Sequence, residues 1–236
     1  MSLRLVTLGA WLLTATMAPG QTPGGSILAV GYLVTSPSDA PAPHGFAYRP
    51  QPGDIVISDD FNRFYHLALK FADTAPPTHA SIVFASADGK PMLLDLTGPH
   101  LLTSKVMLLD VDARFQSYPG VIQVRRLRQP LTPEQSRELT EFALAQQGKR
   151  FAIGRIALMG TPFSARNGLR NTLFGHTYLN RNRWFCSELV IAACAKASLI
   201  DPRACCGNAI YPRDLAVDQH LDLSLLYHPP LTWTPR

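Results

Sequence analysis

Apolar and polar residues alternate along the middle of the chain in patterns that predict short strands and a few helices. The turn Pro52-Gly53-Asp54 introduces an apolar run at 55–58 that is typical of a strand. Apolar residues three and four positions apart predict helices over 62–73, over 132–147 and from Cys186 onward. The other predicted strands are 79–85, 91–96, 106–111 and 121–127. Early strands with flanking helices favour an α+β fold, in which an antiparallel sheet packs against helices.

The N-terminus has the pattern of an export signal. Arg4 precedes a largely apolar run from Leu5 to Ala18, which is too short to span a membrane as a helix. Small residues end this run before a Pro19-Gly20 break. We therefore predict a signal peptide over residues 1–20 and export to the periplasm or cell envelope. A retained membrane anchor, or a plain N-terminal helix, is the alternative.

The remaining chain divides by composition. Residues 21–50 are rich in proline, glycine and small residues and are predicted to form a linker. One apolar stretch, Ile27–Val34, interrupts it and is typical of either a strand or a second short anchor. A catalytic domain is predicted over 51–228, followed by a tail over 229–236.

Composition and charge narrow the range of partners. Hydrophobic residues make up 46% of the 236 residues and charged residues 17%, which favours a packed core over disorder. The formal net charge of +5 suits anionic surfaces, including peripheral association with the cell envelope. No basic run is interleaved with stacking aromatic residues, so we expect no nucleic-acid partner.

The four cysteines, Cys186, Cys194, Cys205 and Cys206, have no zinc-type spacing, so no metal or other cofactor is expected. Export would place the chain in an oxidising compartment, where one disulfide among the last three would leave Cys186 as a thiol. The sequence does not choose the pair. A reduced cytosolic chain is the alternative.

Cys186 lies at the start of a helix that is predicted within the segment Arg183-Trp184-Phe185-Cys186-Ser187-Glu188-Leu189-Val190. The positive end of the helix dipole, together with a nearby imidazolium, lowers the pKa of a thiol. His79, at the start of the strand 79–85, is the candidate general base. These residue types predict a cysteine nucleophile activated by histidine. A cysteine on an apolar helix can also be a small core residue, and this simpler interpretation suits Cys194.

Asp95 is the candidate third member of the site. An Asp88-Gly89 turn predicts a hairpin between strands 79–85 and 91–96, in which Asp95 falls opposite roughly Ile82. A twist or bulge would bring its carboxylate beside His79, where it would hold the imidazole in one tautomer. A polar residue at the end of the strand is the alternative interpretation.

Three segments together carry a family resemblance. Gly53-Asp54-Ile55-Val56, Thr78-His79-Ala80-Ser81-Ile82-Val83 and Phe185-Cys186-Ser187-Glu188-Leu189-Val190 resemble the circularly permuted NlpC/P60 group of papain-like hydrolases, in its YiiX/YaeF-like branch. Gly148-Lys149-Arg150-Phe151 and Tyr211-Pro212-Arg213-Asp214-Leu215 resemble two further segments of that group. In ordinary papain-like enzymes the cysteine helix comes first, whereas here the histidine strand precedes it. The resemblance covers roughly residues 51–216.

The resemblance implies a permuted papain-like fold with Cys186 as nucleophile, His79 as base and Asp95 as the acid on the following strand. Relatives more often have glutamate at that last position. The implied reaction cleaves an amide or ester through a thioester on the cysteine. The substrate would be a cell-wall peptide of peptidoglycan or a lipid. The alternatives are a lipid acyltransferase similar to lecithin:retinol acyltransferase and a non-catalytic binding module.

One segment bears on the substrate. Between Glu141 and Glu188 there are seven cations and no acidic residue. This interval leads directly into Cys186, so we predict a loop or lid that binds an anionic group of the substrate. A solvated basic loop is the alternative. The candidate binding residues are Arg166, Arg170, Arg181 and Tyr178.

Overall fold

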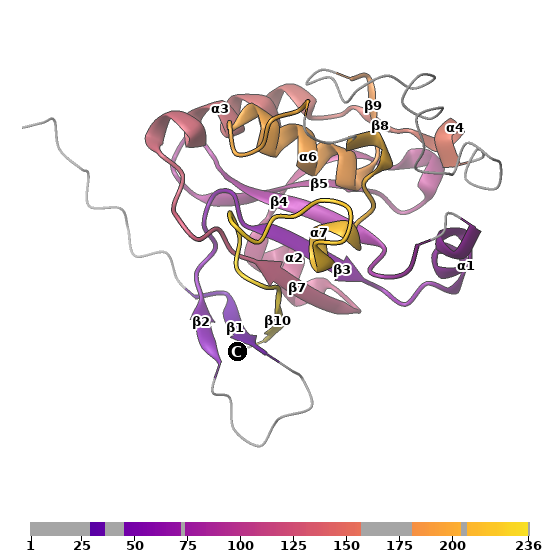
Figure 1. The fold of residues 1–236 in the computed structure, drawn as a ribbon, viewed down its shortest axis with the longest axis horizontal. Coiled ribbons are helices and arrows are strands. Elements are labelled where there is room, and N and C mark those ends of the chain that lie inside the picture. Colours follow the sequence, from indigo (N-terminus) through magenta and orange to yellow (C-terminus); the bar gives the residue numbers. More distant parts are fainter. Residues whose placement is uncertain (1–28, 36–44, 72–73, 157–180, 204–206, 236) are drawn as a thin grey trace, which may run out of the picture.

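The computed structural model describes residues 29–35, 45–71, 74–156, 181–203 and 207–235, which form an α+β fold (Figure 1). The described strands are β1 (Gly31–Val34), β2 (Phe46–Tyr48), β3 (Ile55–Asp59), β4 (His79–Ala85), β5 (Pro91–Thr97), β6 (Lys105–Asp110), β7 (Val121–Arg125), β8 (Arg150–Phe151), β9 (Arg183–Trp184) and β10 (Leu231–Thr234). They form one sheet in the order β2-β1-β10-β7-β3-β4-β5-β6-β8-β9. Every neighbouring pair is antiparallel except β8 and β9.

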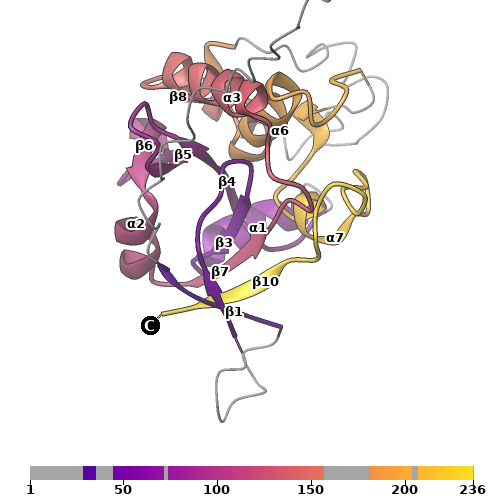
Figure 2. The ribbon, with the colours of Figure 1, turned by 90° about the vertical axis from the view of Figure 1, so that its left-hand side faces the viewer.

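Helices cover both faces of this sheet. The described helices are α1 (Arg63–Phe71), α2 (Val111–Ser117), α3 (Pro133–Gln146), α4 (Ile153–Ile156), α6 (Cys186–Lys196) and α7 (Asp214–Val217), with the short 3-10 turns η1 (Leu101–Thr103) and η4 (Gly207–Ala209). Figure 2 shows α3 and α6 on one side of the sheet and α2 on the other. Among the described residues, no helix is long and apolar enough to cross a membrane.

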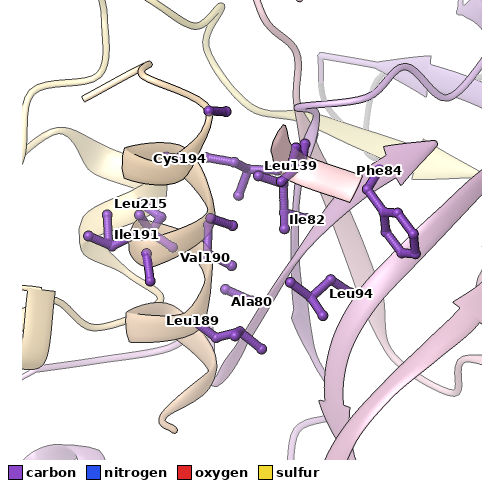
Figure 3. Packing of buried hydrophobic residues seen from close by; sticks show 14 of the residues in the cluster. Ala80, Ile82, Phe84, Leu94, Leu139, Leu189, Val190, Ile191, Cys194 and Leu215 are labelled. Atoms are coloured by element: carbon purple, nitrogen blue, oxygen red, sulfur yellow. The ribbon is translucent and has the colours of Figure 1, made fainter. Parts of the chain in front are cut away.

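The alternation of side chains along the strands creates two cores. Ile55, Ile82 and Leu94 point toward α3 and α6 and pack with the apolar residues of those helices (Figure 3). Val56 and Val83 point to the opposite face and pack against the α2 residues Val111 and Phe115, with neighbouring strands completing this second core. The sheet is thus buried on both faces, which fixes the register of its central strands.

Local sequence signals explain where several elements begin. The side chain of Thr132 accepts a hydrogen bond from Gln135 N at 3.2 Å, and the side chain of Gln135 accepts one from Thr132 N at 3.0 Å. This reciprocal capping, with Pro133 in the first turn, starts α3. Gly53 has φ +93°, and a Cβ there would lie 2.3 Å from Leu127 Cδ1. Glycine is therefore required where the chain enters β3.

The sheet extends beyond both predicted domain boundaries. β1 and β2 fall within residues 21–50, which were predicted to be a linker, and β10 falls within the predicted tail 229–236. β10 pairs with β1 on one side and with β7 on the other. Leu33 is buried in the second core, so the apolar stretch that ends at Val34 contributes a strand of the domain. The segment 1–20 lies outside the described residues.

A buried arginine fastens the C-terminal region to the sheet. Arg125, at the end of β7, is completely buried. Its guanidinium donates to the carbonyl oxygens of Leu215 at 3.0 Å and His228 at 3.1 Å, and to Asp218 Oδ2 at 2.7 Å. Because these three acceptors lie in α7 and the segments after it, one side chain holds the turns that precede β10.

Candidate active site

Helix α6 places Cys186 at its first residue. Its N-cap is Phe185, whose side chain makes no capping hydrogen bond, so the cap residue leaves the first backbone N–H groups of the helix open to other acceptors. Ser187 Oγ donates to Ile210 O at 2.6 Å, and the following apolar residues of α6 are buried against the sheet. These contacts fix the position of α6 and, with it, that of the Cys186 thiol.

His79 comes to the thiol from β4. It is the first residue of that strand and pairs with Ser58 of β3. The imidazole and the Cys186 thiol lie close enough to shift each other's pKa, and the backbone N–H groups of Ala80 and Ser187 also favour the thiolate. The two side chains that the sequence suggested as nucleophile and base therefore lie together, although they are 107 positions apart in the sequence.

Asp95 completes the constellation from β5. Ile82 pairs with Leu94, so Asp95 belongs to the next pair and lies on the sheet face that carries His79. This register differs by one residue from the predicted pairing of Asp95 with Ile82, and such a shift moves a side chain to the other face. Asp95 Oδ1 lies 2.5 Å from His79 Nε2.

Arg114 is a site residue that the sequence reasoning missed. It lies on α2, and its Nε donates to Asp95 Oδ2 at 3.2 Å. Its guanidinium also lies 4.8 Å from the ring centre of Tyr118, a distance typical of a cation–π contact. The carboxylate of Asp95, only 1% exposed, thus faces a cationic group on each of its two oxygens when His79 is protonated. No local motif marks Arg114, and only the packing of α2 against β5 reveals it.

The electrostatics favour a thiolate–imidazolium pair. Burial by itself would lower the pKa of His79, but the Asp95 carboxylate and the Cys186 thiolate raise it to about 10. Burial would raise the pKa of Cys186, but His79 and the N–H groups of Ala80 and Ser187 bring it below its ordinary value. The pKa of Asp95 is also lowered, because His79 and Arg114 outweigh the effect of its burial. Between the pKa values of Cys186 and His79 the site holds a charged pair.

Helix α1 is tied to the same region through a second histidine. His66 Nε2 lies 2.9 Å from Asp59 Oδ1, and Thr78 Oγ1 donates to the same oxygen at 3.3 Å. Thr78 directly precedes His79, so this network joins α1 to the strand that carries His79. The neighbouring Tyr65 has a raised pKa because of its burial, the charge of Asp60 and the Cys186 thiolate. α1 therefore forms one side of the site.

The predicted substrate-binding residues are only partly described. Arg166, Arg170 and Tyr178 lie outside the described residues. Arg181 Nε lies 3.0 Å from Oε1 of Glu188, a fully buried residue in the first turn of α6. This ion pair holds the end of the basic segment against the cysteine helix.

The structure describes two of the four cysteines. Cys186 and Cys194 are both thiols, and Cys194 Sγ lies 3.5 Å from the hydroxyl oxygen of Tyr227 within the core. Cys205 and Cys206 lie outside the described residues, so the predicted disulfide stays a prediction. Over the part of the chain that the structure describes, no group of three or more His, Cys, Asp or Glu side chains is arranged to hold a metal ion.

The similarity of this chain to known proteins lies in its structure. No protein-family model and no curated protein sequence matches the chain. The solved structures that it resembles include the crystal structure of metalloprotein yiiX from Escherichia coli O157:H7, DUF1105. That similarity has a TM-score of 0.43 and 20% sequence identity, and covers 64% of this chain and 67% of that chain. Function is therefore inferred from the side-chain geometry described above.

Proposed function

We propose that this chain is a cysteine hydrolase that cleaves an amide or ester bond through a thioester on Cys186. One observation carries the proposal: Cys186, His79 and Asp95 form a continuous chain of interactions at the uncapped N-terminus of a buried helix. A nucleophile, a base in contact with it and a carboxylate that orients the base are the three parts that such catalysis requires.

The first half of the reaction follows from this geometry. Asp95 accepts a hydrogen bond from His79 Nε2–H, which leaves Nδ1 as the nitrogen that takes the Cys186 proton. The thiolate attacks the carbonyl carbon, and backbone N–H groups at the start of α6 stabilise the negative oxygen. His79 then gives its proton to the leaving amine or alcohol, and the acyl group remains on sulfur as a thioester.

The second half regenerates the thiol. His79 removes a proton from water, the resulting hydroxide attacks the thioester carbonyl, and the carboxylate product leaves while Cys186 recovers its electron pair. A hydroxyl or amine acceptor in place of water would make the same site an acyltransferase. Neither half uses a metal or other cofactor.

We also propose that the fold is a circularly permuted papain-like fold. Two observations support it. The histidine strand precedes the cysteine helix along the chain, yet α6 packs directly on β4 (Figure 3). The three motif segments that resemble permuted NlpC/P60 enzymes are neighbours in the fold, since Gly53 N donates to Val83 O of the histidine strand and His79 of that strand interacts with Cys186. We propose a cell-wall peptide or a lipid as the substrate and the cell envelope as the location.

Trapping the thioester tests the proposed function. The full chain is mixed at mildly acidic pH, where thioesters hydrolyse slowly, with either peptidoglycan stem peptides or phospholipid vesicles, and its intact mass is measured. We expect a mass increase equal to one acyl group, located on Cys186 by fragmentation. Cys186→Ala should abolish the adduct, while Cys194→Ala serves as the matched cysteine control and should retain it. An adduct that survives in Cys186→Ala, or none with either substrate class, would overturn the proposal.

A further inference from the structure

One face of α1 presents a leucine between two basic side chains. Arg63, Leu67 and Lys70 are spaced i, i+4 and i+7, which places them on one side of the helix. All three are exposed, and 53% of Leu67 is accessible to solvent. On the opposite side, Leu69 is buried against Tyr211. Leu69 therefore anchors α1 to the described part of the protein, whereas the side chain of Leu67 is left largely open to solvent.

Phe61 adds an aromatic ring to this surface. It is 57% exposed and has φ 57°, in the left-handed region that bulky residues rarely adopt. The turn is held by two side-chain acceptors: Phe61 N donates to Asp59 Oδ1 and Asn62 N to Asp60 Oδ1, each at 3.1 Å. Such a conformation costs about 1–3 kcal/mol and is maintained mainly at functional surfaces.

This surface adjoins the candidate active site. His66 of α1 and Thr78, the residue before His79, both bind the Asp59 carboxylate. Tyr65, on the same helix, lies within the electrostatic reach of the Cys186 thiolate. A molecule bound along α1 would therefore lie next to the nucleophile.

We propose that Phe61, Arg63, Leu67 and Lys70, here called the α1 surface, dock the protein on an anionic lipid surface and thereby present lipid acyl groups to Cys186. Phe61 and Leu67 would enter the interface, while Arg63 and Lys70 would extend their long side chains to lipid phosphates. The net charge of +5 complements an anionic surface. The choice of lipid as substrate rests on the proposed hydrolase function, whereas docking itself does not.

Two paired substitutions test the apolar and the basic halves of the α1 surface separately. Binding of the full chain is measured by co-sedimentation with vesicles of phosphatidylcholine, with and without phosphatidylglycerol. Phe61→Ser with Leu67→Ser should weaken binding to both vesicle types by at least about tenfold, because burying each side chain is worth about 1.5–3 kcal/mol. Arg63→Ser with Lys70→Ser should weaken binding only to the anionic vesicles, by about tenfold or more, since each cation contributes about 1 kcal/mol.

A matched control separates docking from general surface changes. Leu225 is 86% exposed and lies between α7 and β10, outside the α1 surface, so Leu225→Ser should bind vesicles like the wild type. All five substitutions lie on exposed residues, and single Leu67→Ser replaces the double variant if circular dichroism shows that the double variant is unfolded. Hydrolysis of a soluble short-chain ester should be unchanged in every variant, while hydrolysis of vesicle lipid should fall with binding.

The outcomes distinguish this proposal from the proposed function. Absence of vesicle binding by the wild type, or full binding by the Phe61 and Leu67 variants, would overturn docking even if a stem peptide forms a thioester. Loss of binding in the Leu225 control alone would also overturn it. Normal vesicle binding without any thioester on Cys186 would support docking and overturn the hydrolase.

Discussion

Arg114 Nε lies 3.2 Å from Asp95 Oδ2, while the other oxygen of the same carboxylate lies 2.5 Å from His79 Nε2. The three side chains come from α2, β5 and β4, and the middle one is almost completely buried. Arg114 therefore acts on His79 through Asp95: it keeps the carboxylate charged, and the charged carboxylate keeps the imidazole oriented.

Replacing Arg114 should impair catalysis without removing a reacting group. Arg114→Met should lower kcat/KM for a soluble ester by about tenfold, the factor that corresponds to about 1.4 kcal/mol of lost stabilisation. The pKa of Asp95 should rise, so the acid limb of the pH–rate profile should move to higher pH. Arg114→Lys should restore part of the rate. Arg137→Met, an exposed arginine of α3, is the control, and an unshifted acid limb in Arg114→Met would contradict the positioning role.

The thiolate–imidazolium pair should be visible in the pH dependence of alkylation. Because His79 lowers the pKa of Cys186, the thiol should react with iodoacetamide at pH values below those at which an ordinary cysteine, of pKa about 8.5, does so. In His79→Ala the midpoint of alkylation should move to higher pH. Burial raises the pKa of Cys186, and the imidazole that opposes this effect is then absent. The modified residue is identified by peptide mass, and the buried Cys194 serves as the internal reference. Equal midpoints in the two proteins would exclude activation by His79.

Arg125 should be a major source of stability for the C-terminal region. Arg125→Met removes the buried guanidinium that pairs with Asp218. It also leaves the carbonyl oxygens of Leu215 and His228 without their donor. We expect a loss of about 2–4 kcal/mol in the free energy of unfolding, because a buried acceptor left without its donor costs about 1–3 kcal/mol, whereas water can reach Asp218, which is 30% exposed. Urea denaturation measures this loss, with Arg128→Met as control, because Arg128 makes one exposed hydrogen bond to Ser224 O. Equal midpoints for the two variants would show that Arg125 is dispensable.

Asp54 should make stability fall as pH rises through mildly acidic values. Burial raises its pKa from 3.8 to about 6, against the opposing effect of Arg126. Since the folded state holds this proton more tightly than the unfolded state, the contribution of Asp54 is fully present below its unfolded pKa and is lost as pH rises through the folded one. The change amounts to about 3 kcal/mol, at 1.36 kcal/mol for each unit of pKa.

Urea midpoints at pH 4, 5, 6 and 7 for the wild type and Asp54→Asn would measure this contribution. The urea midpoint of the wild type, relative to that of Asp54→Asn, should be higher at pH 4 than at pH 7. Asp222→Asn is a suitable control, because Asp222 is exposed and its pKa is lowered by Ser224. A constant difference between wild type and Asp54→Asn across this range would show that Asp54 does not titrate there.

The parts of the site that the sequence revealed were those with local signals. Cys186 begins an apolar helix and His79 begins an apolar strand, and each is visible within a window of a few residues. Asp95 was recognised as a candidate, but its position beside His79 depended on a strand register that the hairpin estimate missed by one residue. Arg114 could not be found at all, because its role arises from the packing of α2 on β5, which no nearby pattern encodes.

The same reasoning explains which parts of the fold were missed. The long central strands and α3 carry strong periodicity or capping residues, and the structure has them close to the predicted ranges. β1 lies within the apolar stretch 27–34, for which a strand was one of the two predictions, whereas β2 is a short strand in a segment whose proline- and glycine-rich composition resembled that of a linker. β10 follows the turns that Arg125 holds, and only its pairing with β1 and β7 makes it a strand of the domain.

The place of β10 in the sheet has a consequence for biogenesis. The last strand of the chain lies between β1 and β7, so the first strands reach the rest of the sheet only through it. Until β10 has been made, β1 and β2 have no hydrogen-bonded strand neighbour that links them to β7. Pairing of this edge with the rest of the sheet therefore has to wait for residues 231–234. Deleting residues 231–234 would therefore remove the strand partner of β1 and leave β7 with an unpaired edge.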